Sequence, residues 1–327
     1  MLPVRCVAGG TLLALALLFP AIAAGASRCE GRGPALQNGP LIVDRTAQPW
    51  KEPTTTGLYT ISQRGRGLRR LTTQRRGFSD GRGFSVAASP DGRSVSYVHS
   101  GLPVGVTGTV EVVSLQTRRF RRLTTAARPY LTPATWSADG RRIAFTGWVA
   151  GPSEDLSTWL VRPNGTGARQ LPVTGGRFFA SHYSPNGRCL VGRAVGETGP
   201  NDVAIIGAAG GEFTRVPAVQ ERFAWTKPSG EPRGPRAFRF TPDGRRIAFV
   251  ADSSSGPVVA YSIKLDGSGL REIATMRSVD DAPVFSPDGR FVAYGDRRGT
   301  MVRRVSGGPA RRLLKGSWIK AWAPRPR

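Results

Sequence analysis

Cysteine and histidine are scarce in this sequence, which has three cysteines and two histidines among 327 residues. Metal centres built on these side chains need several of them at short, regular spacing. Neither Cys29 nor Cys189 has a second Cys or a His at such a spacing. We therefore expect no metal site, no cofactor and no thiol chemistry.

Long apolar runs are missing after the N-terminus. A membrane-spanning helix needs about 20 consecutive apolar residues, and no stretch after residue 26 approaches that length. Residues 1–26 combine Arg5, the apolar run 11–19 and the small residues 24–26, which is the pattern of a secretory signal peptide. We expect a signal peptide over 1–26, a linker over 27–39, and export to the periplasm, the cell envelope or the medium without a membrane span.

Acidic residues are few, 22 against 47 lysines and arginines, so the formal net charge is +25. Two interpretations stay open. Basic side chains can line strand edges and discourage pairing with other chains, or they can bind a polyanion such as an envelope phosphate polymer or an acidic polysaccharide. Because no helix-turn-helix, zinc-finger or RNA-binding motif is present, we expect no specific nucleic-acid recognition.

The sequence does contain a turn motif of the type Ser-Pro-Asp-Gly-Arg, repeated five times. Successive copies lie 48, 47, 57 and 45 residues apart, a period typical of propeller blades. In such a turn Pro presets one φ angle and Gly adopts the left-handed conformation, which predicts a tight hairpin. The copies begin at Ser89, Ser137, Ser184, Thr241 and Ser286.

Each turn is followed by a short apolar strand and then by two more strand-like runs, the last rich in arginine. Four strands per repeat is the composition of a propeller blade. In four repeats a large aromatic residue precedes the turn, and we expect it to fill the core between blades. These aromatic residues are Trp136, Tyr183, Phe240 and Phe285.

The two ends of the chain complement each other. Residues 41–43, 58–61 and 69–73 resemble the second, third and fourth strands of a blade that lacks its first strand, and residues 317–324 resemble a first strand without its successors. Together they would form a sixth blade, which leaves no free sheet edge in the ring. We therefore predict an all-β fold: a six-bladed β-propeller of four-stranded antiparallel blades over residues 40–325, closed by both ends of the chain.

The Ser-Pro-Asp-Gly-Arg turn, the following Ile-Ala-Phe strand and the Arg-Arg-Leu-Thr strand resemble the repeats of the TolB-like six-bladed propellers. This resemblance covers residues 40–325 and implies the fold. Similar propellers serve as protein-binding modules, as accessory domains of serine peptidases and, less often, as enzymes. The resemblance therefore leaves the function open.

Function is expected on the face opposite the repeated turns, because irregular loops on a rigid scaffold commonly carry it. The longest segments of that face contain Trp, Phe and Arg, which are enriched at binding hot spots. The insertion 217–235 accounts for the long 57-residue interval. The candidate binding residues are Trp50, His99, Trp148, Arg222, Phe223 and Trp225, with His182 near the central channel.

Catalysis has little support in the sequence. A Ser-His-Asp arrangement needs a base beside its nucleophile, and the Gly-x-Ser-x-Gly elbow is absent. We expect no catalytic residues and a noncatalytic module that binds a protein or peptide of the cell envelope. The alternatives are a binder of an envelope polyanion or glycan, and a glycan- or peptide-processing enzyme at the channel mouth near His182.

Cys29 and Cys189 are the two cysteines left after removal of the expected signal peptide. In an exported protein they can form a disulfide, which would fix the segment 27–39 across the ring. The spacing in the sequence does not supply the distance that disulfide geometry demands. The sequence therefore leaves open whether they pair.

Overall fold

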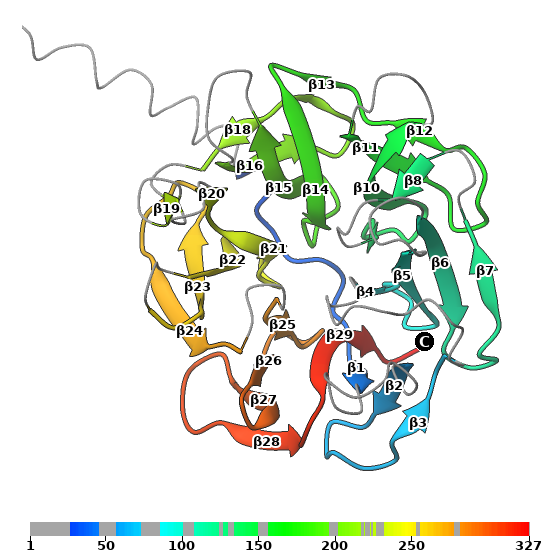
Figure 1. Ribbon diagram of the computed structural model, residues 1–327, viewed down its shortest axis with the longest axis vertical. Helices are drawn as coiled ribbons and strands as arrows, with labels where there is room; N and C mark the ends of the chain where they lie inside the picture. Colours follow the sequence, from blue (N-terminus) through cyan, green and yellow to red (C-terminus); the bar gives the residue numbers. More distant parts are fainter. Residues whose placement is uncertain are drawn as a thin grey trace, which may run out of the picture.

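A computed structural model describes residues 27–45, 57–72, 86–100, 108–123, 127–129, 134–149, 156–195, 202–216, 219, 223, 225–226, 232–252, 256–277 and 282–326. The elements in these ranges are β-strands, and they form a six-bladed propeller (Figure 1). In the same ranges no helix has the length and apolar character needed to cross a membrane.

Five blades follow one another along the chain, each with its strands in antiparallel order from the axis outward. Blade 1 contains β4 (Val86–Ala88), β5 (Ser94–Ser100), β6 (Gly108–Ser114) and β7 (Phe120–Arg122). Blade 2 contains β9 (Thr135–Trp136), β10 (Ile143–Val149), β11 (Leu156–Val161) and β12 (Arg169–Gln170), with β8 (Ala127–Pro129) also paired to β10. Blade 3 contains β14 (Arg177–Tyr183), β15 (Cys189–Val195), β16 (Asp202–Gly207) and β18 (Thr214–Arg215). Blade 4 contains β21 (Arg236–Phe240), β22 (Arg246–Ala251), β23 (Val259–Lys264) and β24 (Arg271–Thr275), and blade 5 contains β25 (Val284–Phe285), β26 (Phe291–Asp296), β27 (Gly299–Arg304) and β28 (Arg311–Leu314).

Blade 6 closes the ring as the sequence predicts. Its first strand is β29 (Trp318–Pro324), from the end of the chain, and its other strands are β1 (Asn38–Arg45), β2 (Gly57–Ile61) and β3 (Arg69–Arg70). Strands β1 and β29 pair antiparallel, with Leu41 opposite Trp322 and Ile42 opposite Ala321. Backbone hydrogen bonds between β1 and β29 thus join the N-terminal and C-terminal parts of the propeller inside one sheet.

The five repeated turns have the same pattern of internal hydrogen bonds. In the first copy the Ser89 hydroxyl donates to Asp91 Oδ1 at 2.5 Å and accepts the amide N–H of Ser94 at 2.9 Å. Asp91 Oδ1 also accepts the amide N–H of Arg93, and the Gly92 amide donates to the Ser89 carbonyl. The glycine of every copy has a φ between 69° and 74°, which confirms the predicted left-handed conformation.

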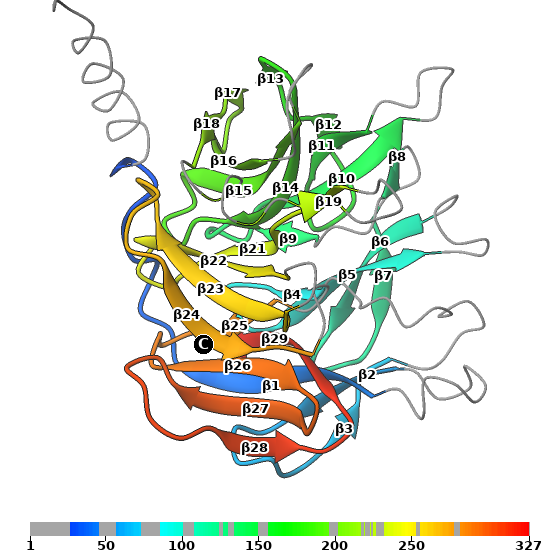
Figure 2. The same cartoon turned by 60° about the vertical axis from the view of Figure 1, so that its left-hand side comes forward.

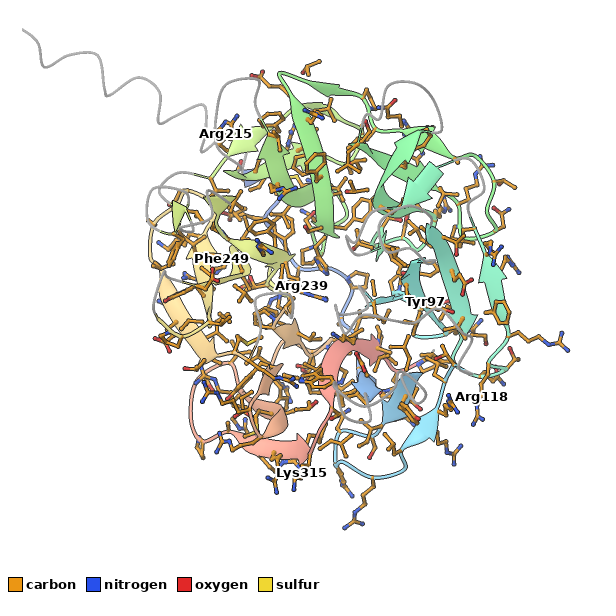
Figure 3. All side chains as sticks on the ribbon, in the orientation of Figure 1. Tyr97, Arg118, Arg215, Arg239, Phe249 and Lys315 are labelled. Atoms are coloured by element: carbon orange, nitrogen blue, oxygen red, sulfur yellow. A yellow bond between two sulfur atoms is a disulfide. The ribbon has the colours of Figure 1, made fainter. Side chains whose placement is uncertain are left out.

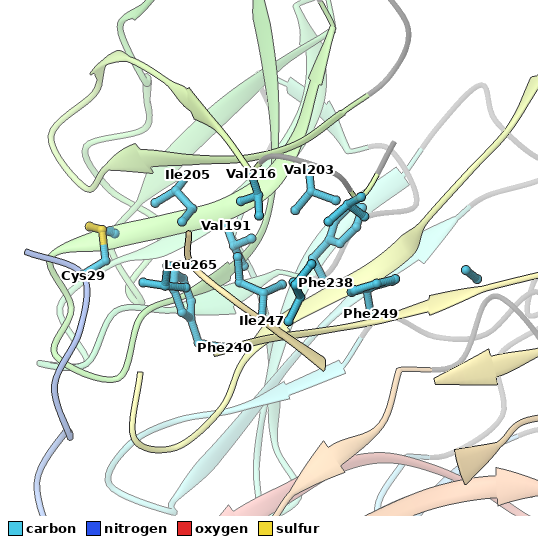
Figure 4. Packing of buried hydrophobic residues seen from close by; sticks show 14 residues of the cluster. Cys29, Val191, Val203, Ile205, Val216, Phe238, Phe240, Ile247, Phe249 and Leu265 are labelled. Atoms are coloured by element: carbon cyan, nitrogen blue, oxygen red, sulfur yellow. A yellow bond between two sulfur atoms is a disulfide. The ribbon is translucent and has the colours of Figure 1, made fainter. Parts of the chain in front are cut away.

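The described residues of the hydrophobic core form six clusters, each between two neighbouring blades. Because successive side chains of a strand point to opposite sides of the sheet, one strand serves two clusters. In β22, Ile247 and Phe249 face blade 3, whereas Ala248 and Val250 face blade 5. Figure 4 shows the cluster between blades 3 and 4. The aromatic residues before the turns lie in these clusters or pack against them, as predicted.

Two short pairings lie outside the blades. Strands β13 (Val173–Thr174) and β17 (Gly211–Glu212) pair in parallel beside blade 3. Strands β19 (Trp225–Thr226) and β20 (Pro232–Arg233) form a hairpin within the insertion between blades 3 and 4. This hairpin lies in a connection from a fourth strand to a first strand. It therefore belongs to the face opposite the repeated turns, which we call the loop face; the face of the turns is the turn face.

Residues 27–37, which we call the strap, cross the centre of the ring on the turn face before the chain enters β1 (Figures 1 and 2). The Gly31 amide donates to the carbonyl of Asp243 in blade 4, and the Gln37 carbonyl accepts from the Arg325 amide after blade 6. At Gly33 an added Cβ would lie 2.5 Å from the Pro185 carbonyl oxygen, so the strap approaches the turn of blade 3 very closely.

A disulfide fixes the strap to the ring. Cys29 and Cys189 are both fully buried in the cluster between blades 3 and 4, and their sulfur atoms are 2.06 Å apart. Beside this disulfide, the Asn186 side-chain amide donates to the carbonyls of Arg28 and Glu30 at 3.0 and 2.8 Å. Asn186 Oδ1 meanwhile accepts from Ser184 and Arg188, as the aspartate does in the other turns.

Candidate functional site

The hairpin on the loop face is anchored by two apolar side chains of the insertion. Val219 is fully buried in the cluster between blades 3 and 4. The Phe223 ring is half-buried, with its centroid 5.4 Å from that of Phe249 and 4.8 Å from that of Tyr261. Phe223 therefore packs on the interblade core, and it supports the hairpin that carries Trp225.

A second feature of the loop face is an arginine stacked on a tryptophan. Arg277 follows the fourth strand of blade 4, and Trp318 begins the first strand of blade 6. The guanidinium carbon of Arg277 lies 4.2 Å from the Trp318 ring centroid, which is a cation–π contact. Arg277 is exposed and Trp318 is half-buried, so the pair presents a preformed planar surface.

Four of the described ionisable residues, His182, Arg239, Lys320 and Asp44, lie in the innermost strands of the blades or in the strand next to one, and we call them the axial cluster. His182 and Arg239 occupy equivalent positions in β14 and β21, one residue before the aromatic side chain that enters the interblade core. Arg239 Nη2 donates to the Lys320 carbonyl oxygen in β29 at 3.3 Å. Arg239 thus reaches toward blade 6 from blade 4, and Figure 3 shows it near the centre of the ring. Lys320 Nζ lies 3.9 Å from Asp44 Oδ2, and both residues are buried.

Burial shapes the charges of the axial cluster. Desolvation, and to a smaller extent the positive charge of Arg239, lower the pKa of His182 to about 3. His182 is therefore neutral at physiological pH. Burial also lowers the pKa of Arg239, to about 10, so the guanidinium stays protonated. The buried atoms Nδ1 of His182 and Nε of Arg239 have no hydrogen-bond partner in the part of the chain that the structure describes.

The structure separates His182 from the loop face. His182 lies one residue before the end of β14 at the turn face, whereas Arg177 begins that strand at the loop face. Five residues of extended chain span about 16 Å. His182 therefore belongs to the axis and not to the loop surface.

The other predicted site residues are described only in part. Trp50 and Arg222 lie outside the described residues. His99 lies in β5 opposite Thr109, Trp148 lies in β10 opposite Leu156, and Trp225 lies in β19 opposite Arg233, but their side chains are outside the described part.

Sequence reasoning missed Arg239, the Lys320–Asp44 pair and Asn186. A signal for Arg239 exists once the repeats are aligned, because the position before the aromatic slot is Thr135 in blade 2 and Val284 in blade 5. An arginine at this inner position stands out against such neighbours. No comparable signal marks Lys320, since its partner Asp44 is distant in sequence and meets it only through the closure of blade 6.

No group of three or more His, Cys, Asp or Glu side chains that could hold a metal ion is found among the described residues. The described axial groups thus offer hydrogen-bond donors and one net positive charge.

Comparison with known proteins establishes the fold. No protein-family model matches the chain, and no curated protein sequence matches it. Among solved structures, TolB from Acinetobacter baumannii is similar, with a TM-score of 0.62 and 17% identity over 88% of this chain and 67% of that one. The chain has the propeller fold of TolB. Putative TolB from Agrobacterium tumefaciens gives a TM-score of 0.56 and 15% identity over 82% of this chain and 98% of that one. A chain of a nidogen/laminin complex gives a TM-score of 0.58 and 10% identity over 87% of this chain and 97% of that one. Like TolB, the chain is a six-bladed ring, and this likeness concerns the fold alone.

Proposed function

We propose that this protein is an exported, noncatalytic binding module whose loop face engages a protein or peptide of the cell envelope. The observation that carries the proposal is the anchored hairpin β19–β20. Val219 and Phe223 fix the insertion to the interblade core, so a hairpin outside the blades is held on a rigid base. A preorganised surface loses less conformational entropy on binding than a flexible one.

The Arg277–Trp318 pair supports the same face. Arginine and tryptophan are enriched among residues that dominate binding energy, and here the stacking of one on the other restricts both side chains. The turn face, by contrast, carries repeated turns and the strap. We propose that Arg277, Trp318 and Trp225 contribute to the interface, together with the loop residues Trp50, Trp148, Arg222 and His99.

A polyanion binder is the second candidate, and the exposed arginines favour it. The fourth strands lie at the perimeter of the ring (Figure 1), and these strands carry exposed arginines. They are Arg69, Arg70, Arg121, Arg122, Arg169, Arg271, Arg311 and Arg312. A polyanion held by such a rim would be released by salt, whereas a complex made by the loop face would persist.

Export is part of the proposal. The signal-peptide pattern of residues 1–26 supports it, and so does the buried Cys29–Cys189 disulfide, because disulfides persist in oxidising compartments.

The test is affinity capture from the native cell envelope with the chain from residue 27 onward, at low salt and at about 0.5 M salt. A protein retained at both concentrations supports the loop-face proposal. Arg277→Ala and Trp225→Ala should then weaken that complex, while Arg245→Ala, an exposed arginine of the turn face, should leave it unchanged.

Two results would contradict this proposal. Capture of glycan or phosphate polymer that disappears at high salt would assign the function to the arginine rim. Equal loss of the protein partner in Arg277→Ala and Arg245→Ala would show that binding does not depend on the loop face.

A further inference from the structure

We infer that the axis of the ring holds a binding site for a single carboxylate of a peptide segment, with Arg239 as its main contact. This inference rests on the proposed function, since the carboxylate would belong to the peptide or protein partner. The juxtaposition of Arg239 and His182 at the axis carries it.

Arg239 is a half-buried cation whose Nε atom is buried, and it has no counter-ion among the described residues. In the part of the chain that the structure describes it makes no ion pair, and its Nη2 donates a hydrogen bond to the neutral carbonyl oxygen of Lys320. The charges of the other described residues of the axial cluster cancel, because Lys320 is paired with Asp44 and His182 is neutral. Removing a charge from water without a partner is costly, so Arg239 leaves one positive charge at the axis that a ligand can neutralise.

The donors around Arg239 fit a carboxylate. A guanidinium binds a carboxylate through two parallel hydrogen bonds, and Nε of Arg239 is a donor that has no partner in the described part of the structure. Nδ1 of His182 is similarly without a partner and can donate a further hydrogen bond in the appropriate neutral tautomer. A carboxylate brings the one negative charge that balances Arg239, whereas a doubly charged phosphate would leave a net negative charge.

The surroundings favour a peptide as the carrier of this carboxylate. The first strand of each blade forms the inner edge of its sheet, and edge strands present backbone N–H and C=O groups that an extended peptide can use. The strap crosses the centre of the ring on the turn face and is held there by the Cys29–Cys189 disulfide and by Asn186 (Figure 1). The peptide would therefore approach along the axis from the loop face, where the proposed partner binds.

The experiment selects binders from two random hexapeptide libraries, one with amidated C-termini and one with free C-termini, against the wild type. An acidic side chain as ligand predicts enrichment of Asp or Glu in the amidated library. A terminal carboxylate predicts binders in the free-acid library alone. For selected peptides we expect affinity to fall about tenfold or more when the acid is replaced by its amide, and equally in Arg239→Met. Arg245→Met, at an exposed position of the turn face, is the matched control and should bind as the wild type does.

Arg239→Met removes a half-buried charge that has no ion-pair partner among the described residues, so its thermal midpoint should equal or exceed that of the wild type. Arg239→Gln, which also lacks the charge, repeats the binding test if the methionine variant does not fold. Binders without an acid preference, or with affinity unchanged in both variants, would overturn the axial carboxylate site and leave the proposed function standing. Absence of binders from both libraries would count against the axial carboxylate site and against the proposed function. Binding of a galacturonic acid oligomer that depends on Arg239, without acidic peptides, would replace the peptide with an acidic glycan.

Discussion

Removal of the Cys29–Cys189 disulfide by the double substitution Cys29→Ala/Cys189→Ala should lower the free energy of unfolding without changing the fold. The cross-link joins residues 160 positions apart. In the unfolded chain it closes a loop that contains blades 1 and 2, part of blade 6 and the first strand of blade 3. In the folded ring these blades are already held by interblade packing. The main effect of the disulfide is therefore on the unfolded state.

The magnitude follows from the loop length. The chain-entropy relation gives about 5 kcal/mol for a loop of this size, and measured values for disulfides are typically about 2–4 kcal/mol. Both cysteines are fully buried, so replacement by alanine adds a small cost for lost packing. We expect a total loss of about 3–5 kcal/mol, which corresponds to a thermal midpoint lower by roughly 5–8 °C.

The assay is urea unfolding followed by tryptophan fluorescence and by far-ultraviolet circular dichroism. The wild type is measured with and without reductant, and the double alanine variant without it. Reduced wild type and the double variant should agree, and their native circular dichroism should match that of the oxidised protein. A loss below about 1 kcal/mol would refute the reasoning, because it would mean that closing this loop does not appreciably restrict the unfolded chain.

Three further predictions concern the turns and the axis. Asn186→Asp should lower the free energy of unfolding in urea by about 1–3 kcal/mol, because the side chain loses both hydrogen-bond donors to the strap. The control Asp243→Asn, at the equivalent turn of blade 4, keeps its acceptor oxygen and should lower it less. Equal losses in the two variants would contradict this role for Asn186. Gly140→Ala should lower the free energy of unfolding by about 1–2 kcal/mol, because alanine is strained at the φ of 70° that Gly140 has. The added Cβ would lie no closer than 3.4 Å to Pro90, so a steric clash should not add to this loss. An unchanged urea midpoint would contradict the prediction. The folded pKa of His182, about 3, lies below the ordinary 6.5, so the unfolded chain binds the proton first and stability should fall as pH drops from about 6.5 toward 3. The slope should reach at most about 1.4 kcal/mol per pH unit, and it should flatten in His182→Gln when urea unfolding is compared at pH 7, 6 and 5.

The fold could be predicted because its signals are local and repeated. The geometry of each turn is set by its own residues, such as Pro90, Asp91 and Gly92, and the hydrogen bonds that fix it join residues within a segment of six. The continuous apolar run of β22 likewise indicates that both faces of the strand are buried, and alternate residues lie in two different clusters. Even the closure of blade 6 is visible in sequence, since a blade without a first strand and a first strand without a blade can be counted.

The site is less accessible to sequence reasoning because its parts come from different blades. Phe223 has the residue type of a binding hot spot, yet the structure packs it on Phe249 and Tyr261. Arg239 reads in sequence as one more arginine among 42. Its distinction is a place at the axis with no counter-ion among the described residues, and this depends on where β21 lies relative to β29.

The sequence alone determined the secondary structure, the number of blades and the joining of the two ends, because turn chemistry and strand periodicity act between residues close in the chain. The tertiary structure decided which charges are balanced and which are not, since the pairing of Lys320 with Asp44 and the isolation of Arg239 arise only when strands far apart in sequence meet around one axis. It also decided the path of the strap. Cys29 reaches Cys189, and Asn186 gains its two acceptors, only because the closed ring brings the turn of blade 3 beneath the N-terminal segment.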